Sequence, residues 1–264
     1  MIKILVPIDF SDTSLNALQY ATDLFKDSML EITLVHVYGA QSTALMMKSI
    51  DGILIRNAED QISSVIKEME SKTSNVVFKT KLVKNYAVSR ISDLGDSGNY
   101  DLIVMGTKGV SGLKEVFMGS VAGGVISKTS APVIVVPLDY KFKSLDKVVF
   151  AVGDTKITNE NSLAPIHKLV SAHQSELEIL HFSKNGPIDL DQRYPSLTDL
   201  SPKFTHKNGD GDLNQHLNVH IQNNDTDLLC LLRTKKNVID RFFSGSVTLK
   251  QTFNSPVPIM VIHD

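Results

Sequence analysis

Residues 101–120 carry the segment DLIVMGTKGVSGLKEVFMGS, in which a short apolar strand pattern leads into a glycine-rich loop. A strand is expected from Leu102 to Met105 and a helix from Gly119 to Lys128. A helix N-terminus presents unpaired amide groups, and glycines before it let an anion approach the backbone closely. The segment fits neither a Walker loop nor the G-x-G-x-x-G fingerprint. From its glycines alone, an anion-binding loop and a loop whose glycines only form turns are equally good interpretations.

Segments of the first half of the chain recur in the same order in the second half. The matching pairs are 3–9 and 147–153, 32–37 and 177–182, 101–105 and 227–231, 119–121 and 245–247, and 131–136 and 257–262. Self-similarity of this kind is the mark of a tandem repeat. The sequence therefore predicts two copies of one domain, at residues 1–138 and 139–264.

Each copy alternates short apolar runs with amphipathic stretches. Continuous apolar runs indicate strands that are covered on both faces, as in a parallel sheet. Right-handed crossovers turn such a chain into an open sheet whose ligand crevice lies beyond the carboxyl ends of the strands. The expected fold is therefore α/β, with two tandem doubly wound, mainly parallel five-stranded sheets and flanking helices. In each sheet the last strand, 133–136 or 259–262, is expected to be outermost.

Composition excludes several classes of function. The chain has 264 residues, 42% of them apolar and 21% charged, with a formal net charge of -2. Its charges are spread along the chain, which predicts no binding of nucleic acid or anionic lipid. No apolar run approaches the roughly 18 to 20 residues of a membrane span, and no signal-like N-terminus is visible, so a cytoplasmic location is expected. The single Cys230 lies in an apolar run and is expected to be an inert core thiol.

The spacing Gly106-x2-Gly109-x9-Gly119-Ser120 resembles the ATP-binding signature of the universal stress protein family. The flanking runs 102–105 and 132–136, the opening segment 7–11 and the run 34–37 are similar to the same family. The resemblance covers nearly all of the first copy and, more loosely, the second. It points to the tandem two-domain members of that family.

This resemblance implies an adenine nucleotide as partner and ATP, with or without Mg²⁺, as cofactor. Asp9 and the backbone near Val37 would meet adenine, while Gly106 and Gly109 would lie against ribose and phosphates. The expected cofactor-binding set is completed by Pro7, Met105, Ser111, Gly119, Ser120 and Val121. The resemblance also implies that the two outermost strands meet antiparallel, which makes an intramolecular pseudo-dimer. Further pairing of two chains as a homodimer stays open.

Several of these residues also have structural explanations. Asp9 can cap the first helix, for which Ser11 and Asp12 are further candidates, and Ser120 can cap its own helix. Gly123 and Gly124 each cost about 1 kcal/mol inside a helix, which is explained by close packing against the sheet or, alternatively, by ligand contact.

The histidines have plain explanations as well. His36 and His181 occupy matching strand ends, where a hydrogen bond to a neighbour is expected. His216 and His220, four residues apart, are expected on a solvated helix face because no third metal ligand accompanies them. We predict no metal site. The apolar stretch 46–54 is expected to pack at a domain or subunit contact rather than to line a ligand groove.

The second copy lacks important parts of the nucleotide signature. Leu232 stands opposite Gly106, Lys235 opposite Gly109, and Gly153 opposite Asp9. A degenerate nucleotide site is therefore expected there, with ATP only in the first copy. Four basic residues could still hold another anion, although a solvated basic loop is the simpler interpretation; they are Arg233, Lys235, Lys236 and Arg241.

The expected function is that of an ATP-binding universal stress protein acting in stress response. Phosphoryl transfer requires a placed metal, a base or a water-orienting group, and the sequence contains no recognisable set of them. We therefore predict no catalytic residues, and any hydrolysis should be slow. Two alternatives remain, a slow ATPase or kinase-like phosphotransferase, and a nucleotide-free interaction scaffold.

Overall fold

The computed structural model describes residues 1–39, 47–107, 119–154, 156–208, 213–233 and 255–264. The first half of the chain supplies β1 (Ile2–Pro7), α1 (Asp12–Leu24), β2 (Leu30–Tyr38), α2 (Met47–Glu70), β3 (Val76–Lys84), α3 (Ala87–Gly95), β4 (Leu102–Gly106), α4 (Ser120–Lys128) and β5 (Val133–Val136). The second half supplies β6 (Lys147–Val152), η1 (Glu160–Leu163), α5 (Ala164–His173), β7 (Glu176–Ser183), α6 (Leu190–Arg193), η2 (Pro195–Leu200), β8 (Lys203–Asn208), α7 (Leu213–Asn223), β9 (Leu228–Arg233) and β10 (Ile259–His263).

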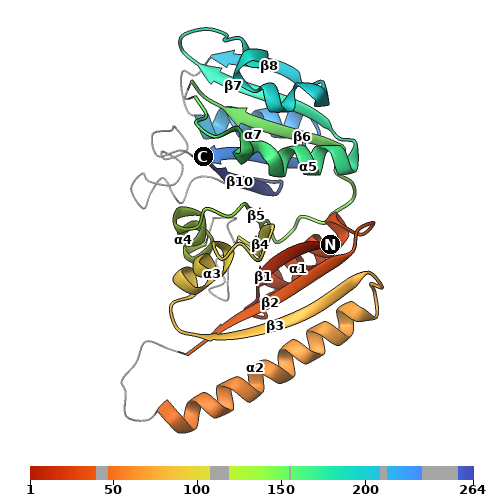
Figure 1. The fold of residues 1–264 in the computed structure, drawn as a ribbon, viewed down its shortest axis with the longest axis vertical. Coiled ribbons are helices and arrows are strands. Elements are labelled where there is room, and N and C mark those ends of the chain that lie inside the picture. Colours follow the sequence, from red (N-terminus) through yellow and green to blue (C-terminus); the bar gives the residue numbers. More distant parts are fainter. Residues whose placement is uncertain (40–46, 108–118, 155, 209–212, 234–254) are drawn as a thin grey trace.

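All of these strands belong to one sheet, in the order β3-β2-β1-β4-β5-β10-β9-β6-β7-β8 (Figure 1). Strands within each half are parallel, as the continuous apolar runs predicted. The mainly parallel α/β fold is thus confirmed. In the first half the chain moves outward from β1 to β3, then returns to the other side of β1 with β4. Right-handed crossovers place α1 and α2 on one face and α3 and α4 on the other.

The two halves join through a single antiparallel strand pair. β5 and β10 pair in register Ile134 to Met260, so that the two five-stranded arrays form one ten-stranded sheet. This is the contact expected of the two outermost strands. Figure 1 shows the result, an elongated molecule with the N-terminal half at one end and the C-terminal half at the other. The domain boundary at 138 stays a prediction.

The connecting segment between β5 and β6 packs along α1. The side-chain amide of Asn16 donates to the backbone carbonyls of Pro137 and Tyr140, at 3.0 and 2.9 Å. The Tyr20 ring meets Phe142 edge-on with centroids 5.6 Å apart, and Phe142 in turn contacts His173 of α5. The connector therefore links α1 of one half to α5 of the other.

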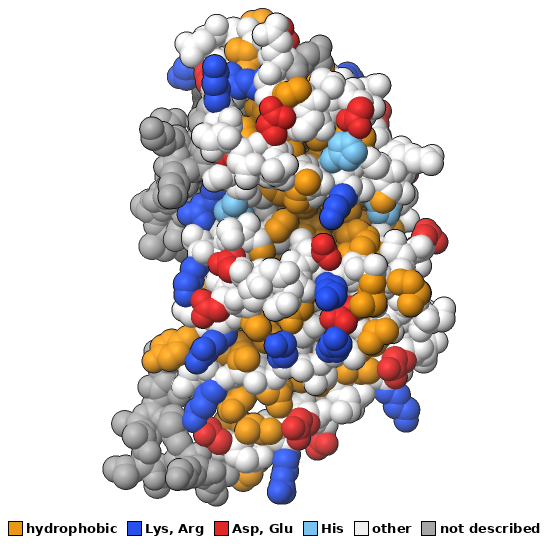
Figure 2. Space-filling view, in the orientation of Figure 1, with side chains coloured by type: hydrophobic (Ala, Val, Ile, Leu, Met, Phe, Trp, Pro, Cys, Tyr) orange, Lys and Arg blue, Asp and Glu red, His pale blue; other side chains and the backbone are white. Residues whose placement is uncertain are grey.

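The surface agrees with the even charge distribution in the sequence. On the face shown in Figure 2, Lys and Arg side chains are interspersed with Asp and Glu. None of the helices within the described ranges has the length and apolar character needed to cross a membrane.

Candidate functional site

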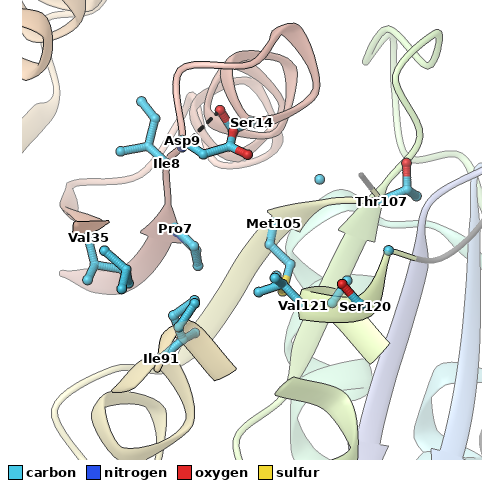
Figure 3. Close-up of a pocket in the computed structure, with 15 residues that line it drawn as sticks. Pro7, Ile8, Asp9, Ser14, Val35, Ile91, Met105, Thr107, Ser120 and Val121 are labelled. Atoms are coloured by element: carbon cyan, nitrogen blue, oxygen red, sulfur yellow. Dashed lines mark hydrogen bonds between the residues drawn. The ribbon is translucent and has the colours of Figure 1, made fainter. Parts of the chain in front are cut away.

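A cavity of about 410 Å³ opens at the carboxyl ends of β1, β2 and β4. It lies where the strand order reverses, which is the position at which open α/β sheets bind ligands. In Figure 3 the residues that end β1 face those that end β4 and begin α4, and Ile91 of α3 lies beside them. The lining residues are Pro7, Ile8, Asp9, Ser14, Val35, Val37, Ala87, Ile91, Met105, Gly106, Thr107, Gly119, Ser120, Val121 and Ala122.

The turn from β1 to α1 fixes the position of Asp9. Phe10 adopts a left-handed backbone conformation with φ of 63°, which turns the chain sharply after the strand. One carboxylate oxygen of Asp9, Oδ1, accepts hydrogen bonds from the Ser11 backbone N–H and hydroxyl, at 3.1 and 2.5 Å. Ser11, and not Asp9, caps α1, because its Oγ accepts from the Ser14 N–H. Asp9 therefore has one oxygen committed to the turn and one free of it, at the rim of the cavity.

His36 supports this turn from β2. Its Nδ1 lies 2.8 Å from the Ile8 carbonyl oxygen, and its ring packs against Phe10 with centroids 4.8 Å apart. The prediction that His36 bonds a neighbouring strand end is confirmed. The same holds for His181, whose Nε2 lies 3.0 Å from Asp154 Oδ1.

Gly106 lines the cavity with its backbone, but its lack of a side chain has another cause. A Cβ at this position would lie 2.8 Å from the Thr13 carbonyl oxygen and 2.9 Å from the Thr13 carbonyl carbon. The first turn of α1 thus approaches β4 so closely that only glycine fits. Helix–strand packing is thus sufficient to require this glycine, and its expected contact with ribose and phosphates stays a prediction.

The N-terminus of α4 closes the cavity opposite Asp9. Gly119 occupies the N-cap position, and it has no side chain with which to cap the helix. The expectation that Ser120 caps its own helix is therefore wrong, since Ser120 is already the first helical residue and is exposed. The first amides of a helix have no intrahelical partner. With glycine at the N-cap, no side chain of the N-cap residue itself separates them from an anion in the cavity.

Gly124 inside α4 is also explained by packing, although against a different neighbour than expected. A Cβ there would lie 2.7 Å from Cγ2 of Val88. Because Val88 belongs to α3, the close contact is between two helices and not between helix and sheet.

Eight of the ten predicted site residues line this one cavity. They are Pro7, Asp9, Val37, Met105, Gly106, Gly119, Ser120 and Val121. That they bind a ligand stays a prediction. Gly109 and Ser111 lie outside the described residues, as do Met46, Lys235, Lys236, Arg241 and the Gly245-Ser246 pair.

Ala87 and Ile91 of α3 were missed, although both line the cavity. Apolar residues four apart on a short helix look like core residues, so the sequence offered no signal for them. Ile53 and Leu54 of α2 are exposed, so they form no contact between the two halves. Their role at a subunit contact stays a prediction.

The second half carries a leucine, Leu232, where the first half carries Gly106. Leu232, which stands opposite Gly106, is 3% exposed. The first helices of the two halves also differ in where they start: β6 and α5 are separated by residues 153–163, whereas β1 and α1 are separated by 8–11. Tyr194 is also buried, and its ring meets that of Phe150 edge-on with centroids 5.6 Å apart.

The carboxylate of Asp154 is committed to internal hydrogen bonds. Besides His181, Ser183 Oγ donates to it at 2.9 Å and Asn185 Nδ2 at 3.1 Å. Burial alone would raise the pKa of Asp154, but these hydrogen bonds outweigh it and lower the pKa. Asp154 is therefore a stably charged part of the structure, and it does not replace the adenine-side carboxylate that Asp9 would supply.

His216 and His220 were expected on a solvated helix face, and this prediction is wrong for His220. His220 is 4% exposed, and its Nε2 lies 3.2 Å from Oε1 of Glu178, which is 1% exposed. Lys147 lies 3.4 Å from the other Glu178 oxygen. Burial lowers the pKa of His220, although the neighbouring Glu178 acts in the opposite direction. His216 stacks on Phe182. Within the described ranges, no three side chains of His, Cys, Asp or Glu come together as a metal site.

Comparison with known proteins agrees with this geometry. The profile of the universal stress protein family matches residues 1–137. The chain belongs to that family. Two universal stress proteins of Methanocaldococcus jannaschii are 29% and 30% identical over 144 and 155 residues, which cover 51% of this chain and 81% and 93% of theirs. Both of these relatives match about half of the chain.

One solved structure spans both halves. A universal stress protein of Archaeoglobus fulgidus superimposes with a TM-score of 0.72, covering 99% of this chain and 96% of its own. Its sequence identity is 19%, so it shows the fold alone. The chain described here thus shares its fold with that structure over 99% of its length.

Proposed function

We propose that this universal stress protein binds ATP, with or without Mg²⁺, in the N-terminal cavity and acts in the cytoplasm in stress response. The observation that carries the proposal is the pairing of two features across one cavity. The uncapped N-terminus of α4 offers amide donors and a positive dipole end, and the Asp9 carboxylate lies on the opposite side. A nucleotide has matching ends, an anionic phosphate chain and a base with an amino group.

The walls suit the part of a nucleotide between those ends. Val35, Val37 and Ile91 provide an apolar lining for the base. The cavity volume of about 410 Å³ falls within the usual range of roughly 300–1,000 Å³ for small-molecule sites. In this arrangement the free oxygen of Asp9 accepts from the adenine amino group, and the phosphates lie at Gly119 to Val121. Mg²⁺ would be held by phosphate oxygens and water, as is usual for this ion.

We propose a binding role rather than catalysis. The described residues around the cavity include one carboxylate, Asp9, and no histidine or lysine. A base and a water-orienting group are what phosphoryl transfer requires. Hydrolysis should therefore be slow, and incubation with labelled ATP distinguishes turnover from retention. Rapid turnover would favour the alternative of an ATPase or phosphotransferase.

The C-terminal half is proposed to be mainly structural, a second domain from residue 139 with a degenerate site. Leu232 and the committed Asp154 support this. Antiparallel pairing of β5 and β10 supports an intramolecular pseudo-dimer of the two domains. Whether two chains form a homodimer is a question for sedimentation of the purified protein.

The deciding experiment is calorimetric titration of the full chain with ATP, with AMP, ADP and cyclic AMP as competitors. Gly119→Val places a branched side chain at the N-cap of α4 and should lower ATP affinity more than tenfold without unfolding the protein. Gly52→Val, on the exposed part of α2, is the matched control and should bind as the wild type does. Unchanged affinity in a folded Gly119→Val variant contradicts the proposed site, and no binding by the wild type favours the scaffold.

A further inference from the structure

The helix that closes the cavity is held at its other end by the C-terminal half. Arg233 Nη1 donates to the Ile126 carbonyl at 2.6 Å, and His263 Nε2 lies 2.9 Å from the same oxygen. Arg233 ends β9 and His263 ends β10, so both donors come from strands of the other half. With nine residues, α4 is about 13 Å long and spans the distance from the cavity to this contact.

The Ile126 carbonyl is one of the last four in α4, which have no amide partner within a helix. The Arg233 charge lies at the negative end of the helix dipole, where a cation is favourable. Burial lowers the pKa of His263, with the adjacent Arg233 charge acting in the same direction. The Ile126 carbonyl accepts from His263 when Nε2 carries a proton, at a distance of 2.9 Å.

α4 depends on such contacts because its own sequence is a poor helix. Gly123 and Gly124 stand in its middle, where each costs about 1 kcal/mol relative to alanine. Its N-terminus has no capping side chain. Its remaining contacts with the first half are made mainly with α3, through Val88 at Gly124 and a 3.7 Å ion pair between Lys128 and Asp93. A weak helix that is fixed at its C-terminus from outside will move or fray when that fixation is lost.

We propose that Arg233 and His263 are positioning residues of the N-terminal nucleotide site, supplied by the C-terminal half. They hold α4 so that the amides of Ser120 to Ala122 point at the phosphate chain. The C-terminal half, whose own site is degenerate, thereby completes the site of the first half. This inference rests on the proposed function, because it assigns a role toward the same nucleotide.

The test is the affinity of the full chain for two ligands, ATP and adenosine, measured by calorimetry. Arg233→Met keeps the aliphatic stem and removes the donor and the charge. ATP affinity should fall about tenfold, which corresponds to one charged hydrogen bond. Adenosine has no phosphates to place at α4, so its affinity should change less than twofold. Arg233→Lys restores a charged donor and should recover part of the ATP affinity.

Arg193→Met is the matched control. Arg193 also donates to a backbone carbonyl, that of Asp154, but does so within the C-terminal half. This variant should bind both ligands as the wild type does. If it loses ATP affinity to the same degree, or if Arg233→Met weakens ATP and adenosine equally, the positioning role is refuted and the effect is one of general stability.

Hydrogen exchange without nucleotide separates this inference from the proposed function. In Arg233→Met and in His263→Phe, the amides of 123–128 should exchange faster than in the wild type, while those of β1 and β4 should not. Unchanged exchange and unchanged ATP binding overturn the positioning role but leave nucleotide binding intact. If the wild type binds no nucleotide, both the positioning role and the proposed function fail.

Discussion

Gly106 provides a direct test of why the central glycine at the cavity is needed. In Gly106→Ala, the new Cβ would lie 2.7 Å from Thr13 Cγ2, 2.8 Å from the Thr13 carbonyl oxygen and 2.9 Å from its carbonyl carbon. Two of these three atoms belong to the backbone of α1, which cannot rotate away as a side chain can. To reach ordinary contact distance, the first turn of α1 and β4 must separate by about half an ångström.

The cost follows from overpacking. Forcing one extra carbon into a well-packed site costs about 1–3 kcal/mol, and the lower entropy of the unfolded alanine chain offsets about 0.4–1 kcal/mol of that. We expect Gly106→Ala to lower the free energy of unfolding by about 1–2 kcal/mol. For a domain of this size, each kcal/mol corresponds to a melting temperature lower by about 2–4 °C.

Urea unfolding followed by circular dichroism measures this loss in the ligand-free protein. Gly52→Ala is the matched control, because a Cβ at Gly52 meets nothing within 4 Å. Gly52 lies inside α2, so its replacement should stabilise the protein by about 0.5–1 kcal/mol. Wild-type stability in Gly106→Ala, combined with a loss of ATP affinity, would show that this glycine serves the ligand and that the packing explanation is wrong.

Three further outcomes are expected. Gly124→Ala should destabilise the protein by about 1 kcal/mol in urea, and Val88→Ala in the same chain should relieve the clash; no relief means that the contact is not limiting. Glu178→Gln removes the nearer of two carboxylates beside the half-buried Lys147, with Glu176 left at 3.8 Å, and should cost about 1–3 kcal/mol at pH 7. Burial lowers the pKa of His220, so wild-type stability should fall as the pH decreases below about 6.5. Burial would raise the pKa of Glu178, but hydrogen bonds and nearby cations outweigh it and lower the pKa. Wild-type stability should therefore fall further below about pH 4.5. Glu178→Gln should lack the loss of stability below about pH 4.5, and a pH profile identical to that of the wild type would refute the pairing. Calorimetry should saturate at one ATP per chain, and two equivalents of similar affinity would contradict the degenerate second site.

Much of the fold was predictable because strand and helix patterns are local properties of the sequence. The strands expected at 102–105 and 133–136 are found at Leu102–Gly106 and Val133–Val136. The site was predictable where it is built from strand ends and a helix start. Asp9, Met105 and Gly119 were implied by the family resemblance, and their position in one cavity agrees with the rule that the carboxyl ends of parallel strands meet at one edge of the sheet.

What could not be predicted depends on contacts between distant segments. Glycine is needed at position 106 because Thr13 lies against it, and only the packing of α1 on β4 determines the position of Thr13. His220 was expected in solvent, and its partner, Glu178, lies on β7, four elements earlier in the chain. Arg233 was assigned to a basic loop, and nothing in its sequence neighbourhood indicates the Ile126 carbonyl. Pairs of this kind follow from topology, and periodicity carries no information about them.

The connector that packs along α1 has a consequence for assembly in dilute solution. Residues 137–146 tie the two halves together, so β5 and β10 meet at an effective concentration of order millimolar, whatever the amount of protein present. Two separate single-domain chains joined along the same strands would dissociate as they were diluted below their dissociation constant. Here the contact at Ile126 persists in a single isolated chain, so nucleotide affinity should not depend on protein concentration.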